Sequence, residues 1–107
     1  MNYSIAVSPV FEKQSERLNK KYPSIFRDIK QLSDDLITNP FQGSSLRNGL
    51  YKIRMKIASK GQGKSGGARV ITCIKVVENK ITLVAIYDKS ELETMTVKEL
   101  AELLKIK

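Results

Sequence analysis

The hydrophobic periodicity of this chain changes once, near Asn39-Pro40, and this change limits the fold more than any other feature. Before it, apolar residues recur every three or four positions, as on one face of a helix: Ile25, Ile29, Leu32 and Leu36. The other face of this helix carries Arg27, Asp28, Lys30 and Asp34. Proline disfavours helical geometry in the residue before it, so the helix must end near Asn39.

After the change, apolar and polar residues alternate, as in a half-buried strand. One side of this predicted strand carries Tyr51, Ile53, Met55 and Ile57, and the other carries Leu50, Lys52, Arg54 and Lys56. The first side suits a core, and the second is predominantly cationic.

Local signals predict the remaining elements. Residues 3–7 alternate like a short strand, and Ser8-Pro9 predicts the cap and first turn of a helix that ends near Lys21. Two Val- and Ile-rich runs, 68–77 and 81–87, predict strands joined by a turn at Glu78-Asn79. A capping box over 96–99 predicts a terminal helix. The predicted fold is α+β, with an antiparallel sheet packed against helices in the order β-α-α-β-β-β-α.

Length and composition suit one compact domain spanning residues 1–107. No apolar run approaches the roughly 18 residues that a membrane span needs. The first residues lack the pattern of a signal peptide, and the one cysteine, Cys73, has no partner for an internal disulfide. We therefore expect a cytoplasmic protein that does not associate with membranes.

The net charge of +8 comes from a single part of the chain. Between Leu36 and Val77 there is no Asp or Glu, and this stretch carries eight basic residues: Arg47, Lys52, Arg54, Lys56, Lys60, Lys64, Arg69 and Lys75. Elsewhere 11 basic and 11 acidic residues cancel. Solubility alone does not require such segregation, which is typical of a surface that neutralises phosphates.

The chain contains no histidine, which restricts the chemistry open to it. Catalysis that relies on a histidine base is excluded, as is a zinc site built on histidine. Lysine, arginine, tyrosine and carboxylate groups remain available. We expect no metal and no small-molecule cofactor.

The clearest candidate site is the row Lys52, Arg54 and Lys56, with Arg69 near the start of the adjoining strand. Alternate residues of a strand lie roughly 6.5 to 7 Å apart, close to the spacing of phosphates along one nucleic-acid strand. Neighbouring cations repel one another unless an anion binds between them. This pattern favours a phosphate-binding surface.

Such a surface contains the groups needed to cleave RNA, because the 2′-hydroxyl of the substrate can act as nucleophile. In this hypothesis Lys52 or Lys56 accepts the hydroxyl proton. Arg54 and Arg69 stabilise the charge on phosphate, and Lys89 assists the leaving oxygen. No metal is required.

Further RNA contacts are predicted at Arg47, Lys60, Lys64 and Tyr87. For Tyr87, core packing is an equally good interpretation, whereas Tyr51 belongs to the core face. The segment 58–65 matches a loosened phosphate-loop pattern, but it precedes a β-branched run instead of a helix, which argues against nucleotide hydrolysis. The acidic residues from Asp88 to Glu93 fit a solvated loop better than a metal site.

Taken together, several short motifs resemble the RelE/ParE superfamily of type II toxins. The motifs are Asn39-Pro40, Gly43, Leu46, Gly49–Arg54, Gly66–Ile71 and Ile86–Glu91. The long loop 60–67 is most similar to HigB-like members. The resemblance implies a RelE-like fold and a ribosome-dependent endonuclease that cuts mRNA codons in the A site, held inactive by a cognate antitoxin.

The resemblance also implies roles for individual residues. Lys52, Arg54 and Arg69 match the basic catalytic positions of the family. The chain departs from the pattern near Ser90, where RelE-like nucleases have a catalytic arginine and only Lys89 is close. Their late tyrosine has no counterpart here.

Two alternative functions remain open at this point. The first is a poison of DNA gyrase, like the ParE branch, and the second is an RNA-binding module without catalysis. The phosphate-sized row of cations favours the nuclease over the gyrase poison.

Overall fold

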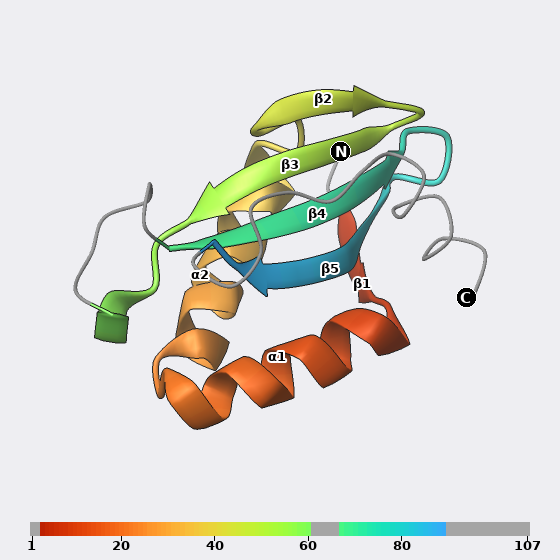
Figure 1. Cartoon of the computed structure of the whole chain (residues 1–107). Helices are drawn as coiled ribbons and strands as arrows, with labels where there is room; N and C mark the ends of the chain where they lie inside the picture. Colours follow the sequence, from red (N-terminus) through yellow and green to blue (C-terminus); the bar gives the residue numbers. More distant parts are fainter. Residues whose placement is uncertain (1–2, 61–66, 90–107) are drawn as a thin grey trace.

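A computed structural model describes residues 3–60 and 67–89. Within these ranges the order of elements is β1 (Ser4–Val7), α1 (Pro9–Lys21), α2 (Ile25–Thr38), β2 (Ser44–Arg47), β3 (Leu50–Met55), the 3-10 turn η1 (Ala58–Lys60), β4 (Ala68–Lys75) and β5 (Lys80–Asp88) (Figure 1). This confirms the α+β class, and it adds one strand, β2, to those predicted. The predicted helix over 96–99 and beyond lies outside the described residues. In the described part of the chain, no helix is long and apolar enough to cross a membrane.

The strands form one five-stranded sheet in the order β1-β5-β4-β3-β2. All neighbouring strands are antiparallel except β1 and β5, which run parallel. The sheet is therefore mixed, whereas the sequence predicted an antiparallel sheet. The parallel pair joins the first and last described strands, which no hairpin connects. Turn signals set the direction of consecutive strands only.

The strand that the prediction missed, β2, forms a hairpin with β3. The turn at Arg47, Asn48 and Gly49 has positive φ angles of 85°, 53° and 78°. Asn-Gly is a strong signal for such a turn, because both residues tolerate this conformation. That dipeptide would have predicted the hairpin.

Helix α1 begins as predicted, and its cap also completes the sheet. The Oγ of Ser8 accepts a hydrogen bond from Phe11 N (3.0 Å) and donates one to Val84 O (2.8 Å). The register shifts at Val84, which is an extra residue in β5, and β1 pairs with β5 only as far as Leu83. Gln14 Oε1 accepts from Ile86 N (2.8 Å). The side chains of Ser8 and Gln14 therefore form hydrogen bonds with backbone groups of β5 beyond its pairing with β1.

Helix α2 buries the predicted apolar face, but one residue of its predicted polar face lies inside. Asp28 is 8% exposed, and its Oδ2 accepts hydrogen bonds from Ser24 Oγ (2.7 Å) and Ala58 N (3.1 Å). Helical periodicity alone places Asp28 in solvent. The tertiary contact with η1, far away in sequence, draws it inward because the carboxylate satisfies an otherwise unpaired backbone N–H.

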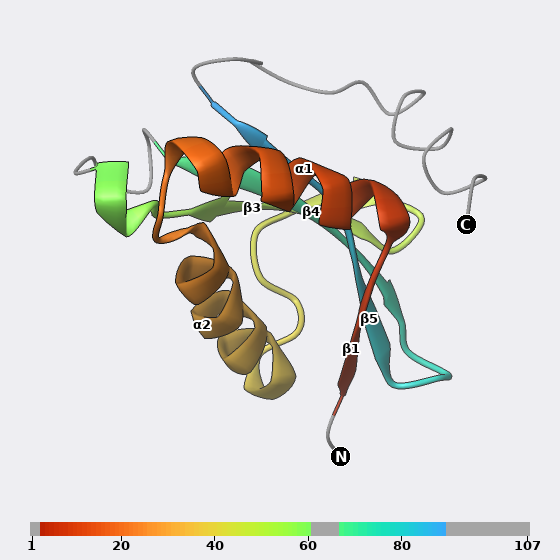
Figure 2. The ribbon, with the colours of Figure 1, turned by 90° about the horizontal axis from the view of Figure 1, so that it is seen from below.

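The sheet is buried on both faces. Residues of α1 and α2 pack with β3, β4 and β5 in the main core, which includes Leu18, Ile25, Leu36, Ile53, Val70 and Ile86 (Figure 2). A smaller cluster on the other face contains Leu50, Ile71, Cys73, Val84, Ala85 and Tyr87. Leu50, predicted to share the cationic face, is 2% exposed within this cluster. That face is thus apolar in part and cationic in part.

A buried carboxylate ties the end of β5 to α1 and η1. Asp88 is fully buried, and it accepts hydrogen bonds from Tyr22 Oη (2.7 Å) and Lys60 Nζ (2.9 Å). The Lys60 and Lys21 ammonium groups lie 5.5 Å and 5.4 Å from the centre of the Tyr22 ring. The prediction of a solvated loop is therefore wrong for Asp88, whose charge is compensated inside the protein.

Replacing Tyr22 with phenylalanine removes one hydrogen bond to this buried charge. We expect Tyr22→Phe to lower the free energy of unfolding by about 1.5–3 kcal/mol, as for hydrogen bonds to charged groups. Urea unfolding followed by circular dichroism measures this loss. Tyr3→Phe is the control, since no hydrogen bond of the Tyr3 hydroxyl occurs among the described residues. Equal stability of the two variants would contradict the role given to the Tyr22–Asp88 bond.

Candidate nucleic-acid interface

The pairing of β3 with β4 brings the predicted cations together. Arg54 lies directly opposite Arg69 in the register, and Lys52, two residues earlier, shares the same face of β3. Side chains directly opposite on antiparallel strands have Cβ atoms about 4.5–5.5 Å apart. Three positive groups therefore converge on one part of the sheet.

A groove of about 460 Å³ lies at this position, and we call it the cationic groove. Its lining includes the cations Lys52, Arg54, Arg69 and Lys89, together with Ile53 and the segment from Gln42 to Ser44, which lies beside β3. The backbone of Lys89 is held next to β4 by a hydrogen bond from its N to Gly67 O (3.1 Å). Four of the five predicted catalytic residues thus line a single groove.

The cations of the groove differ in exposure. Arg54 is exposed, Lys52 is half-buried and Arg69 is only 5% exposed, with Nη1 donating to Ala68 O (3.3 Å). Charges interact more strongly where water is excluded, so Arg69 suits close contact with an anion. Among the described residues, neither Lys52 nor Arg54 forms an ion pair with a carboxylate. Their mutual repulsion falls when an anion binds between them.

Lys56, the fifth predicted catalytic residue, does not line the cationic groove. It is exposed and lines a neighbouring groove with Asp28 and Asp35. Strand β3 ends at Met55, so Lys56 lies just beyond it, although buried and exposed residues still alternate from Ile53 to Ile57. Of the predicted row Lys52, Arg54 and Lys56, only the first two therefore line the cationic groove.

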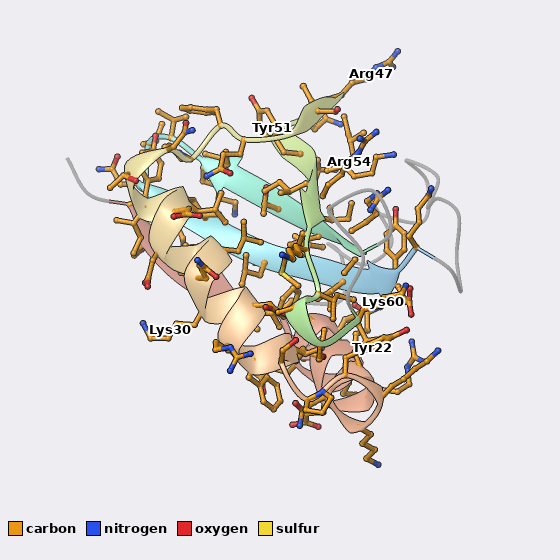
Figure 3. The ribbon with its side chains drawn as sticks, turned by 90° about the vertical axis from the view of Figure 1, so that its left-hand side faces the viewer. Tyr22, Lys30, Arg47, Tyr51, Arg54 and Lys60 are labelled. Atoms are coloured by element: carbon orange, nitrogen blue, oxygen red, sulfur yellow. The ribbon has the colours of Figure 1, made fainter. Side chains whose placement is uncertain are left out.

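The predicted RNA contacts are scattered. Arg47 is exposed but pairs with Leu50 at the opposite end of β3 from Arg54, outside the groove (Figure 3). Lys60 is bound to Asp88, and its side chain is 13% exposed, which contradicts its predicted role in binding RNA. Lys64, with most of the phosphate-loop-like segment, lies outside the described residues.

Tyr87 is also placed differently from its predicted role in base stacking. It is 3% exposed and packs in the smaller cluster with Ile71 and Ala85. A buried ring offers no face to a base, so the structure favours core packing. Tyr51 lies on the helix side as predicted, with its ring centre 6.0 Å from that of Phe41.

The segment from Gln42 to Ser44 was not predicted to belong to the site. Gly43 has a φ of +89°, and a Cβ at this position would overlap Lys52 O. The chain can therefore pass close to β3 only because residue 43 is glycine. Glycine soon after Asn39-Pro40 is a weak signal, because many surface loops contain it.

Two comparisons with known proteins agree with this architecture. A family model described as the RelE toxin of the RelE/RelB toxin–antitoxin system matches residues 11–107. The chain belongs to the RelE toxin family. Among solved structures, a free-state double mutant of the E. coli toxin RelE is similar to this chain, with a TM-score of 0.67 and 13% identity over 95% of this chain and 97% of that one. At this identity the structural match supports the fold alone.

If the cationic groove of this RelE-type toxin binds single-stranded nucleic acid, we expect that binding to depend on salt. Each phosphate contact contributes a slope of about −0.7 to log K against log salt for single strands. We expect Arg54→Ala to weaken binding of a single-stranded oligonucleotide and to reduce the slope by about one such contact. Titrations by fluorescence anisotropy at several salt concentrations measure both effects.

Lys30→Ala is the matched control, because it removes one positive charge from the outer side of α2, away from Arg54 (Figure 3). We expect this variant to keep the slope of the unmodified protein. The same change of slope in both variants would show that net charge, and not the cationic groove, governs binding.

Proposed function

We propose that this RelE-type toxin is a ribosome-dependent endoribonuclease that cuts mRNA in the A site and thereby arrests translation. The observation that carries the proposal is the convergence of Lys52, Arg54, Arg69 and Lys89 on one groove. A groove lined by four cations is suited to a phosphodiester, whose charge rises as the phosphorus becomes pentavalent.

The proposed reaction is an attack of the RNA on itself. The 2′-hydroxyl oxygen forms a bond to phosphorus, and the bond from phosphorus to the 5′-oxygen of the next nucleotide breaks. Lys52 in its neutral form accepts the 2′-hydroxyl proton, and Lys89 donates a proton to the departing 5′-oxygen. The products are a 2′,3′-cyclic phosphate and a free 5′-hydroxyl, so no water, metal or cofactor enters this step.

The two arginines have a different role in this scheme. Arg54 and Arg69 face each other across β3 and β4, and guanidinium groups bind phosphate oxygens in a fixed geometry. Arg69 is held by its burial, whereas Arg54 is exposed and can approach the substrate. Together they stabilise the additional negative charge of the transition state.

The ribosome, the antitoxin and the cellular compartment form part of the same proposal. The family description names an antitoxin system, which supports a cognate antitoxin as partner of this toxin. Such an antitoxin would neutralise the toxin in the cytoplasm, where mRNA is translated. The HigB-like assignment is also a proposal, because it rests on the loop 60–67.

Cleavage of mRNA on a programmed ribosome tests this function. We expect the purified toxin to cut within the A-site codon and Arg54→Ala to cut about 10²–10³-fold more slowly, as when one transition-state donor is removed. Lys52→Ala should have a comparable effect. A 2′-deoxy nucleotide at the cleavage position should abolish the reaction, because the nucleophile is missing. Primer extension locates the cuts.

Lys30→Ala serves as control, since Lys30 is exposed on α2 and lines neither of the two grooves. It should retain cleavage within a few-fold of the unmodified toxin. Cleavage of the 2′-deoxy substrate, or full activity of Arg54→Ala in a folded protein, would contradict the scheme. Growth arrest with DNA damage and intact mRNA would support a gyrase poison, and binding without cuts would support a non-catalytic module.

A further inference from the structure

A second groove adjoins the cationic groove at the edge of the sheet. It has a volume of about 430 Å³ and lies between α2 and the end of β3. Gln42, Ile53 and Arg54 line both grooves, so the two meet at these residues. The pairing of β2 with β3 ends at Ser44 and Lys52, which leaves this part of β3 without a strand beside it. A polymer bound in the first groove can therefore continue into the second.

The chemistry changes from one groove to the other. The second groove has apolar lining from Leu32, Ile53 and Met55, none of which is more than 8% exposed. Its polar lining includes Gln31 and Asp35. A lining that combines apolar side chains with hydrogen-bonding groups suits a planar base, whereas the four cations suit a phosphate.

One carboxylate of the second groove is available to a ligand. Asp28 is buried, with Oδ2 accepting from Ser24 Oγ and Ala58 N. Asp35 is exposed, and its side chain forms no hydrogen bond or ion pair with the described residues. A carboxylate only accepts hydrogen bonds, so it pairs with an exocyclic amino group and repels a carbonyl oxygen.

The cations at the mouth of the groove fit a neighbouring phosphate. Arg54 and Lys56 are two residues apart on nearly extended chain, which corresponds to roughly 6.5–7 Å. A phosphate held at Arg54 places the next one within reach of Lys56. This explains why Lys56 is basic although it is absent from the cationic groove.

We propose that the second groove is a subsite for the base next to the cleaved phosphodiester, and that Asp35 selects a base carrying an amino group, such as cytosine, over uracil. The subsite rests on the proposed nuclease function, since it takes the nucleotide that follows along the bound strand. An extended peptide paired with the open edge of β3 is the competing occupant. The continuity with the cationic groove favours the RNA strand.

The test uses programmed ribosomes whose mRNAs differ only in cytosine or uracil beside the cleavage position. A 2′-deoxy nucleotide at that position blocks the reaction, so that binding is measured separately from cutting. We expect the toxin to bind the mRNA with cytosine beside the cleavage position about tenfold more tightly than the mRNA with uracil there. This difference corresponds to the loss of about one hydrogen bond to a charged group. In Asp35→Asn the preference should fall to about twofold or less, because the amide also donates to uracil O4.

Asp34→Asn is the matched control, since it makes the same change on the preceding residue of α2. Asp34 does not line the second groove. It should keep the preference for cytosine. Equal binding of both mRNAs by the unmodified toxin, or a preference unchanged in Asp35→Asn, overturns the subsite.

Cutting of the all-ribose mRNAs separates this result from the proposed function. Binding with a cytosine preference but no cutting refutes the nuclease and leaves the subsite. Cutting with a preference that Asp35→Asn does not change refutes the subsite and leaves the nuclease. A toxin that does not bind programmed ribosomes contradicts both.

Discussion

The antiparallel register between β3 and β4 is the constraint on which the rest of the candidate site depends. It pairs Arg54 with Arg69 and, one position further, Met55 with Ala68. A shift of one residue would send Arg54 to the helix side of the sheet and Ile53 away from it. Because Ile53 and Val70 are buried in the main core, such a shift is strongly disfavoured. Hydrophobic packing on one face thus fixes the positions of charges on the other.

The ionic residues of this toxin divide into two groups with different surroundings. Lys60 and Asp88 compensate each other in the interior, with the Tyr22 hydroxyl as a third partner. Lys52 and Arg54, in contrast, have no carboxylate partner among the described residues. A compensated pair adds no net charge to the surface, while the cations without a carboxylate partner add positive charge at the groove. The net charge of the chain therefore predicts that the surface potential is positive. Burial and ion pairing decide which basic residues contribute to this potential.

The elements that could be predicted from the sequence depend on local interactions. The cap at Ser8 and the apolar face of α2 follow from the spacing of residues along one helix. The shared face of Lys52 and Arg54 follows in the same way from strand alternation. The parallel pairing of β1 with β5 joins segments more than 70 residues apart, and no local signal specifies it. The same limit applies to Lys60, whose partner Asp88 is 28 residues away.

Local sequence patterns specify the residues at the ends of elements least, and these residues shape the grooves. Lys56, one residue beyond the end of β3, lines the second groove and not the cationic one. Gln42 enters the site because Gly43 permits a close passage beside Lys52. Where β2 stops pairing at Ser44, the edge of β3 opens and the two grooves meet. The length of one short strand thus determines that the two grooves are continuous.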